Sequence, residues 1–160
     1  MTRSKYQRYK ALDNEENYMY NAFISYAQDV TGFVEEECIP NLETVGGLKI
    51  CVHHRDFKPA EDILQNMTNA IHHSRKTIFI VTKSFLESKF CMWEFNIARM
   101  ESIYTRGGEN ILFLVFYEQI QSKELPLLML ELIQQQSYIE YPNDEQGNIV
   151  FWNKIRETIA

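Results

Sequence analysis

One acid of this sequence lies in strongly apolar surroundings. Glu94 is part of the segment FCMWEF (90–95), between Trp93 and Phe95. An apolar environment raises the pKa of a carboxyl group, and acids with a raised pKa are frequent at catalytic sites. The alternative interpretation is that Glu94 lies at the margin of an amphipathic helix and has no chemical role. The buried face of that helix would then consist of Trp93, Ile97, Met100 and Tyr104.

Histidine, serine and cysteine residues give no comparable signal. The histidines form two adjacent pairs, His53–His54 and His72–His73. Adjacent side chains on a strand or a helix point in divergent directions, so a metal site would require the two pairs to converge. Ser25, Ser84 and Cys91 have no His–acid pair that the sequence places beside them, as activation of a nucleophile requires. We therefore expect neither a bound metal nor nucleophilic catalysis.

Composition excludes several other classes of protein. The formal charge of −6 disfavours a nucleic-acid partner, which would require a basic surface. Three scattered cysteines are not a disulfide framework and are typical of a reducing compartment. The longest clean apolar run, 111–117, is far shorter than the roughly 18 residues that cross a bilayer. The sequence predicts a soluble, cytosolic chain with one domain.

The elements that must position these residues alternate between strands and helices. We expect strands at 20–26, 48–53, 76–82, 111–117 and 137–141, and helices over 29–43, from 63, over 84–104 and over 149–159. Pro40 should kink or end the first helix, a capping box at Ser84–Glu87 should open the third, and Arg106-Gly107-Gly108 should end it. Repeated alternation of this kind predicts a parallel sheet with helices on both faces.

The apolar pattern of the strands also predicts their order. The first, third and fourth are apolar throughout, as central strands are, whereas the second and fifth alternate as partly covered edge strands do. This gives a flavodoxin-like α/β fold with five parallel strands in the order 2-1-3-4-5. Functional loops should then follow the carboxyl ends of the strands, at 27–30, 54–61, 83–87, 117–122 and 142–148.

Those loops lack the usual nucleotide and phosphate sites. The turn after the first strand, 27–30, contains no glycine, whereas a phosphate cradle requires a Gly-rich turn. A phospho-receiver of this topology would need clustered acids there and an aspartate ending the third strand. The chain has Asp29 alone and Thr82-Lys83 at those places. We expect no cofactor.

Three segments resemble the sequence boxes of the Toll/interleukin-1 receptor (TIR) domain, in the right order and at the right spacing. They are YNAFISY (20–26), RDFKPAED (55–62) and Phe151-Trp152. Residues 74–95, PNLE (40–43) and YIEYP (138–142) look most like the cytoplasmic TIR domain of a Toll-like receptor. The resemblance covers residues 20–160. Residues 1–19 would be a flexible juxtamembrane lead-in, since their first ten contain four bases and no acid.

The resemblance implies a signalling module of innate immunity that associates with TIR domains of a paired receptor and of adaptor proteins. The homotypic assembly would be weak. The domain would lie on the cytoplasmic side of a membrane, reached through an upstream span that this sequence does not contain. A cytosolic adaptor is an alternative. The principal contact surface would be the loop of Arg55, Asp56, Phe57, Lys58, Pro59, Ala60, Glu61 and Asp62.

The physical character of this loop fits such a role. Its charges would set partner choice and encounter rate, and Pro59 would lower the ordering cost of docking. Phe57 would be either an anchor for a partner or part of the core, and Arg55 and Asp56 would either contact a partner or pair within the domain. We expect charge reversal at Asp56, or replacement of Pro59, to reduce association and to leave folding intact.

The sequence departs from the family pattern at two positions. Ala60 replaces the usual glycine, so a turn with positive φ there would be strained. Asn21 replaces the usual aspartate of the first box, which should leave the first strand intact.

The resemblance also gives Glu94 an enzymatic alternative. Some TIR domains cleave NAD⁺ to release nicotinamide, and their catalytic glutamate matches Glu94 in the C-x-x-E pattern that begins at Cys91. A carboxylate there could stabilise the oxocarbenium-like centre as nicotinamide leaves. This alternative predicts a nucleotide-sized cleft near the carboxyl ends of the strands, with NAD⁺ as a substrate.

Overall fold

The computed structural model describes residues 18–160 and contains one five-stranded parallel sheet. The expected lead-in, 1–19, falls mostly outside the described residues. The strand order is β2-β1-β3-β4-β5, which confirms the predicted flavodoxin-like topology and both predicted edge strands. The strands are β1 (Tyr20–Ser25), β2 (Ile50–Val52), β3 (Ser74–Val81), β4 (Leu112–Phe116) and β5 (Tyr138–Glu140).

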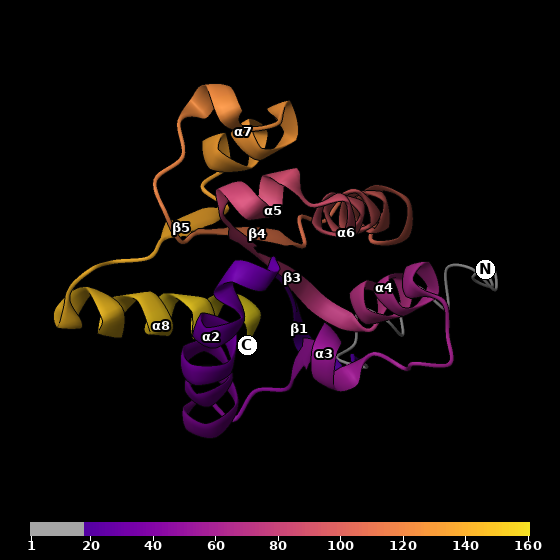
Figure 1. Ribbon diagram of the computed structural model, residues 1–160, viewed down its shortest axis with the longest axis horizontal. Helices are drawn as coiled ribbons and strands as arrows, with labels where there is room; N and C mark the ends of the chain where they lie inside the picture. Colours follow the sequence, from indigo (N-terminus) through magenta and orange to yellow (C-terminus); the bar gives the residue numbers. More distant parts are fainter. Residues whose placement is uncertain (1–17) are drawn as a thin grey trace, which may run out of the picture.

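Helices connect the strands and cover both faces of the sheet (Figure 1). The α-helical segments are α2 (Thr31–Phe33), α3 (His53–Asp56), α4 (Ile63–His72), α5 (Lys83–Glu87), α6 (Lys89–Met100), α7 (Leu127–Gln134) and α8 (Glu145–Ile159). The 3₁₀ segments are η1 (Gln28–Val30) and η5 (Ser122–Glu124), and the π-helical segments are η2 (Val34–Cys38), η3 (Pro40–Val45) and η4 (Glu101–Thr105).

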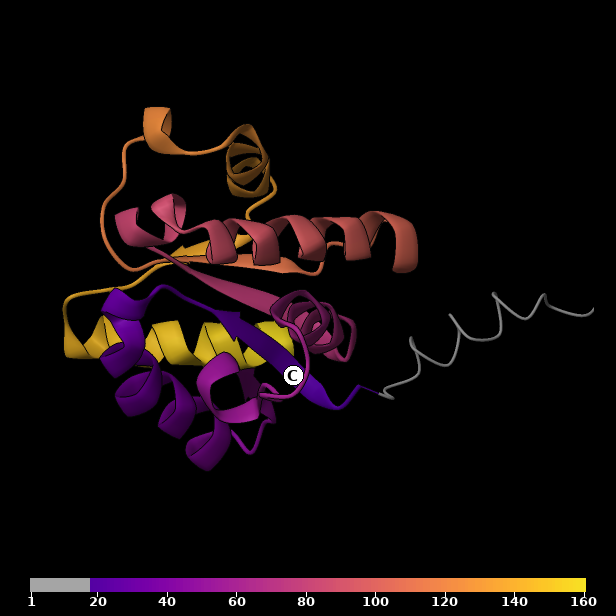
Figure 2. The ribbon, with the colours of Figure 1, turned by 45° about the vertical axis from the view of Figure 1, so that its right-hand side comes forward.

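The core consists of two apolar layers, one on each face of the sheet. Figure 2 shows α6 on one side of the sheet and α8 on the other. Alternate strand residues face the two layers: Ile24 packs in the layer with α8, η2 and η3, whereas its neighbour Phe23 packs in the layer with α4, α6 and α7. This alternation of side chains along the central strands buries them on both faces, as their continuous apolar sequences predicted.

The first helical region passes through Pro40 instead of ending there. π-Helical hydrogen bonding spans this region, and the backbone N–H of Ile39 donates to the carbonyl of Val34. Because a proline has no N–H to donate, a locally wider helix accommodates it. The helical region ends at Val45, before Gly47, which has a φ of 65°.

Two local predictions were wrong. Thr82, and not Ser84, caps α5, because its side chain accepts from the backbone N–H of Phe85. Ser88 then caps α6 separately by accepting from the backbone N–H of Cys91. The edge strand β2 is buried along its whole length and not half covered, since helical segments flank both of its faces.

Asn21 makes direct use of its amide in the first box. Its Nδ2 donates to the carbonyl of Ile159 at 3.0 Å, and its Oδ1 accepts from the backbone N–H of Lys49 at 3.0 Å. The residue therefore connects β1 to the end of α8 and to the segment before β2. The prediction that β1 stays intact without an aspartate is confirmed.

Candidate functional site

The loop after β2 is anchored at its base by Arg55 and Asp56. The Arg55 guanidinium makes two 2.9 Å bonds to Glu43 and donates to the carbonyl of Ile50 at 2.6 Å. Asp56 accepts from the backbone N–H of Val52 at 2.9 Å and pairs with Arg55. The sequence left open whether Arg55 and Asp56 contact a partner or pair within the domain. The structure shows that both pair within the domain.

This geometry bears on charge reversal at Asp56, which the sequence suggested as a variant that leaves folding intact. Reversing the charge of Asp56 would place a cation beside Arg55 and remove the acceptor of a backbone N–H. Such a change would loosen the loop itself, so its effect on association would report on folding as well as on contact.

Phe57 is half-buried and packs against the domain core. Its ring stacks on that of Phe23, with the centroids 5.7 Å apart, and it packs against the layer that contains α4 and α6. The side chain therefore fixes the middle of the loop against the core, in agreement with the second of the two roles that the sequence left open.

The exposed tip of the loop is Lys58-Pro59-Ala60. It forms a turn closed by the N–H of Glu61, which donates to the carbonyl of Lys58 at 3.2 Å. Among the described residues other than glycine, only Gln136 has a positive φ, so Ala60 adopts an ordinary conformation without strain. The question raised by alanine in place of glycine is thus resolved by a turn that suits alanine.

A buried amide, which sequence reasoning missed, holds this turn from behind. Asn66 on α4 is 8% exposed. Its Oδ1 accepts from the N–H of Lys58 at 2.8 Å, and its Nδ2 donates to the carbonyls of Lys58 and Glu61. Asp62 caps α4 by accepting from the N–H of Gln65. The tip is thereby presented on a fixed support, which lowers the entropy lost on docking.

Glu94 is buried within the layer between the sheet and α6. It is 5% exposed, and its Oε1 accepts from the hydroxyl of Ser25 at 2.6 Å. Burial raises the pKa of Glu94 to about 7, and the bond from Ser25 acts in the opposite direction. The expectation of a raised pKa agrees with this environment.

The predicted buried face of α6 was wrong at three of its four residues, and only Ile97 packs against the core. Trp93, Met100 and Tyr104 are exposed, and the buried side chains of the helix are Cys91, Glu94, Phe95 and Ala98. Glu94 therefore lies on the core face itself and not at its margin.

A cavity of about 800 Å³ opens at the carboxyl ends of β4 and β5. Its walls include Lys83, Tyr117, Glu118 and Tyr141, and Glu94 is not among its lining residues. The hydrolase alternative predicts a nucleotide-sized cleft beside Glu94 near the carboxyl ends of the strands, and Glu94 does not line this cavity.

The two histidine pairs lie at opposite ends of the sheet. His53 and His54 follow the carboxyl end of β2, and His54 contacts the Tyr26 hydroxyl and Glu35. His72 and His73 precede the amino end of β3, where His72 pairs with Glu101 at 3.1 Å. The pairs do not converge on one site.

Comparison with known proteins identifies the family. The family profile of the TIR domain matches residues 22–149. Toll-like receptor 4 of Pinctada imbricata is 47% identical over 163 residues, which cover 100% of this chain and 18% of that receptor. Toll-like receptor 13 of Mus musculus is 33% identical, over 91% of this chain and 15% of the receptor. The chain belongs to the TIR-domain family.

Solved structures of TIR domains share its fold. The TIR domain of the Toll-related receptor TRR-2 from Hydra magnipapillata is 21% identical, with a TM-score of 0.71 over 88% of this chain and 98% of that one. A TIR-STING receptor from C. gigas is 23% identical, with a TM-score of 0.66 over 90% of this chain and 40% of that one.

This TIR domain spans 15% to 20% of the length of the Toll-like receptors that it matches. Within the described residues, no helix is both long and apolar enough to cross a membrane.

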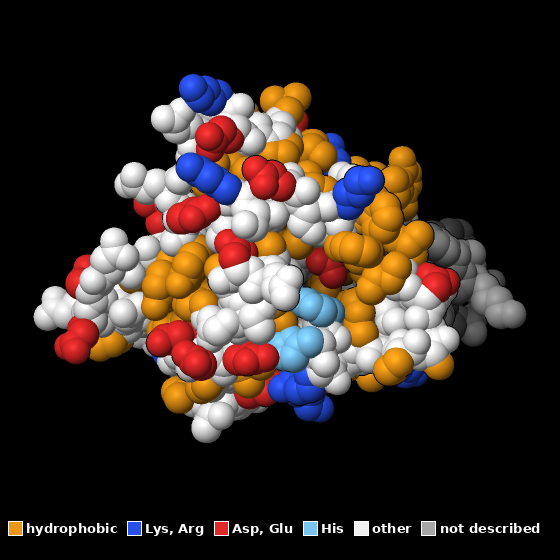
Figure 3. All heavy atoms as spheres, viewed as in Figure 1, with side chains coloured by type: hydrophobic (Ala, Val, Ile, Leu, Met, Phe, Trp, Pro, Cys, Tyr) orange, Lys and Arg blue, Asp and Glu red, His pale blue; other side chains and the backbone are white. Residues whose placement is uncertain are grey.

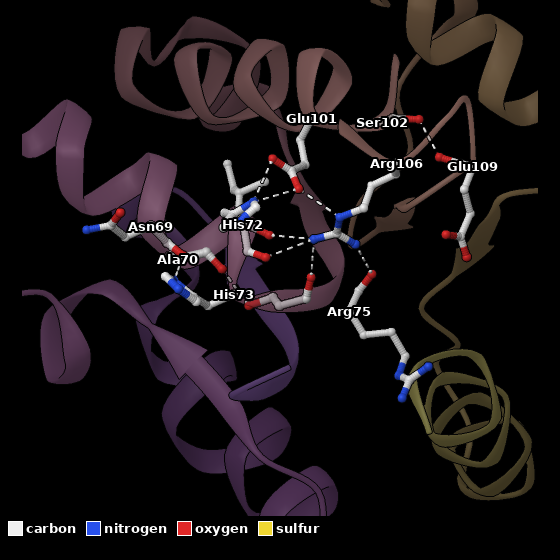
Figure 4. Close-up of polar contacts among 11 residues, drawn as sticks. Asn69, Ala70, His72, His73, Arg75, Glu101, Ser102, Arg106 and Glu109 are labelled. Carbon is white, nitrogen blue, oxygen red and sulfur yellow. Dashed lines mark hydrogen bonds and ion pairs between the residues drawn. The ribbon is translucent and has the colours of Figure 1, made fainter. Parts of the chain in front are cut away.

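The end of the TIR domain opposite the contact loop holds a buried arginine that sequence reasoning read only as part of a helix stop. Arg106 is 4% exposed and donates to the carbonyls of Ile71, His72, Ser74 and Arg75. Its Nε donates to Glu101 at 2.7 Å (Figure 4). Gly107 and Gly108, at φ values of 64° and 86°, turn the chain away immediately afterwards. In the sequence, the sign that pointed to this role was the position of Arg106 immediately before two glycines.

Proposed function

We propose that this TIR domain is the cytoplasmic signalling module of a Toll-like receptor. It pairs with the TIR domain of a second receptor and recruits adaptor proteins through their own TIR domains, in innate immune signalling. The observation that supports this most is the 47% identity to a Toll-like receptor over the full length of this chain. In the intact receptor a single membrane span precedes the domain and places it on the cytoplasmic side.

The contact loop, 55–62, supplies the recruiting surface, and its tip makes the contact. Lys58, Pro59 and Ala60 are exposed on a turn that Asn66 supports from behind. Arg55, Asp56 and Phe57 shape the loop through bonds and packing inside the domain. A charged, preorganised tip of this kind favours selective but modest association.

Substitutions at the tip test this proposal because the tip side chains contribute little to the stability of the fold: Lys58 has a 3.9 Å surface ion pair with Glu61, and exposed pairs of this kind contribute little. Lys58→Glu reverses an exposed charge, and Pro59→Gly loosens the turn. We expect each to weaken binding to an adaptor's TIR domain by about tenfold or more, without changing thermal unfolding. Lys154→Glu, on the exposed side of α8, is the matched charge-reversal control and should bind as the parent does. Normal binding by both tip variants would refute the assignment of the loop.

One observation favours an enzymatic alternative, namely a buried glutamate whose pKa is raised to about 7. The separation of Glu94 from the 800 Å³ cavity speaks against it. We therefore expect no nicotinamide release from NAD⁺ by the purified chain, even at high protein concentration, with Glu94→Gln as the control. Release that the substitution abolishes would make this domain a hydrolase and move the functional site to Glu94.

A further inference from the structure

His54, the residue before the contact loop, lies where three elements meet. It belongs to α3, and its ring contacts Tyr26 at the end of β1 and Glu35 on η2. Figure 3 shows histidine side chains at the surface of the molecule, next to acidic and basic ones. His54 and Glu35 are exposed, whereas Tyr26 is only 4% exposed. The imidazole therefore connects a buried hydroxyl to a carboxylate at the surface.

The two ring nitrogens of His54 have different partners. Its Nδ1 contacts the hydroxyl of Tyr26, and its Nε2 lies 3.1 Å from a carboxylate oxygen of Glu35. Burial, together with the charges of Glu35 and Glu94, raises the pKa of Tyr26, so its hydroxyl keeps a proton to donate. A ring proton on Nε2 faces the Glu35 carboxylate, whereas the opposite tautomer would set a bare nitrogen against it. The arrangement therefore favours a neutral imidazole that accepts at Nδ1 and donates from Nε2.

Ring contacts pack these residues into one unit. The ring of Tyr26 lies 4.8 Å from that of His53 and meets the edge of His54 at 6.1 Å, measured between centroids. His53 in turn meets the ring of Phe57 at 6.0 Å. Burial and the neighbouring His54 lower the pKa of His53, which favours its neutral form. The unit thus reaches from the end of β1 to the middle of the contact loop.

The base of the contact loop depends on bonds to its surroundings. The α3 segment has only four residues and no side-chain cap, and so short a helix is not stable by itself. Arg55 and Asp56 tie it to η3 and β2. His54 adds separate ties to β1 and η2. These two ties reach elements that the bonds of Arg55 and Asp56 do not.

We propose that His54 is a positioning residue of the contact loop, which it holds to β1 and η2 by accepting from Tyr26 and donating to Glu35. The proposal rests on the proposed function, since it names a residue that sets the position of the recruiting surface. A second proton on the ring would occupy Nδ1, and the buried Tyr26 hydroxyl would lose its acceptor. The added charge would strengthen only the pair with Glu35, which contributes little because its carboxylate is half exposed. Protonation therefore loosens the base of the loop.

Nitrogen NMR of the His54 ring in the 160-residue chain tests the arrangement directly. At about pH 7.5 we expect a neutral ring with its proton on Nε2. Tyr26→Phe removes the donor to Nδ1 and should shift the Nδ1 resonance. A parent ring with its proton on Nδ1, or an Nδ1 resonance that Tyr26→Phe leaves in place, would overturn the proposal.

Amide hydrogen exchange of residues 52–58 measures how firmly the base of the loop is held. His54→Asn keeps an acceptor near the place of Nδ1, whereas His54→Lys keeps only a donor for Glu35. We expect exchange to rise by about fivefold or more in His54→Lys and in Tyr26→Phe, and to stay near the parent rate in His54→Asn. His73→Lys, at an exposed histidine at the other end of the sheet, is the matched control and should exchange as the parent does. Faster exchange in His54→Asn than in His54→Lys would overturn the role of the Tyr26 bond.

A pH profile separates positioning from a general loss of stability. Histidine side chains gain protons between about pH 7.5 and pH 5.5. Over this range, exchange of residues 52–58 relative to an unstructured peptide should rise in the parent but not in Tyr26→Phe, whose Nδ1 has no bond to lose. Both proteins share the other titratable and charged groups around His54 and Tyr26, which are Glu35, Cys38, His53, Arg55 and Glu94. Parallel profiles would overturn the proposal.

Failure of this inference can be told apart from failure of the proposed function. The NMR and exchange measurements need no adaptor, so they test the bonds of His54 by themselves. Weaker binding of Tyr26→Phe to an adaptor's TIR domain supports the positioning role, and unchanged binding overturns it. Normal adaptor binding by the tip variants Lys58→Glu and Pro59→Gly overturns the proposed function, and with it the positioning role, whatever the exchange data show.

Discussion

The environment of Glu94 differs strongly from that of the residues next to it in the sequence. The residues beside it include the exposed Trp93, yet Glu94 itself points into the core and binds Ser25. A buried carboxyl with a raised pKa is neutral over part of the range in which a surface acid is fully charged. Because of Glu94, the stability of this domain should therefore depend on pH.

We predict that Glu94→Gln removes this dependence. Burial raises the pKa of Glu94 from 4.5 to about 7, so its contribution to stability is present below pH 4.5 and is lost as the pH rises to about 7. Relative to the glutamine variant, the parent should lose about 3 kcal/mol of unfolding free energy across that window. Denaturant unfolding of both proteins from pH 4.5 to 7.5 measures the difference.

Glu87→Gln, at an exposed acid, is the control for this experiment and should follow the parent at every pH. A difference between parent and Glu94→Gln that stays constant with pH would contradict the raised pKa.

Single residues of the contact loop were only partly predictable. The sequence contains the charges and the aromatic ring, but whether these face inward depends on residues far along the chain. Arg55 is held by Glu43, and Phe57 stacks on Phe23. Because local pattern carries no information on such distant partners, both roles stayed open until the fold was known.

At the scale of elements, α6 carries two apolar stripes that compete for the core. One contains Cys91, Phe95 and Ala98, and the other contains Trp93, Ile97, Met100 and Tyr104, of which only Ile97 packs against the core. Both have helical spacing, and the second stripe holds the larger side chains, so periodicity alone favoured the wrong one. The small Cys91 and Ala98 allow close approach to the sheet, and such packing distances are not visible in an apolar pattern.

Arg106, Glu101 and the carbonyls that Arg106 binds form a clamp that joins α4, β3 and η4 at the end of the domain opposite the contact loop. Burial alone would raise the pKa of Glu101, but the bond from His72 and the charge of Arg106 outweigh it and hold that pKa below its ordinary value. The clamp also satisfies carbonyls at the end of α4 and the start of β3. It thereby ties both elements to η4.

We predict that Arg106→Lys destabilises the domain by about 3 kcal/mol, because lysine cannot reproduce the planar fork and leaves buried carbonyls without donors. Thermal and denaturant unfolding measure the loss. Arg99→Lys, at a surface ion pair with Glu131, is the matched control and should change stability by less than about 1 kcal/mol. Equal effects of the two substitutions would show that the clamp adds no stability.

For the whole molecule, the sheet order was predictable because two independent signals agreed. Alternation of strands and helices indicated a parallel sheet, and the continuous apolar strands indicated its centre. The element ends were less predictable, as the caps at Thr82 and Ser88 show. Several serine and threonine residues near 82–88 can cap a helix, and the packing of α5 and α6 selects among them.

The central claim is that this TIR domain recruits an adaptor's TIR domain through the tip of its contact loop. Its most direct test is a binding titration between the two purified domains, run in parallel with Lys58→Glu and the control Lys154→Glu. Our account predicts saturable binding that Lys58→Glu weakens by about tenfold or more and Lys154→Glu leaves unchanged. Equal binding by all three proteins would contradict it.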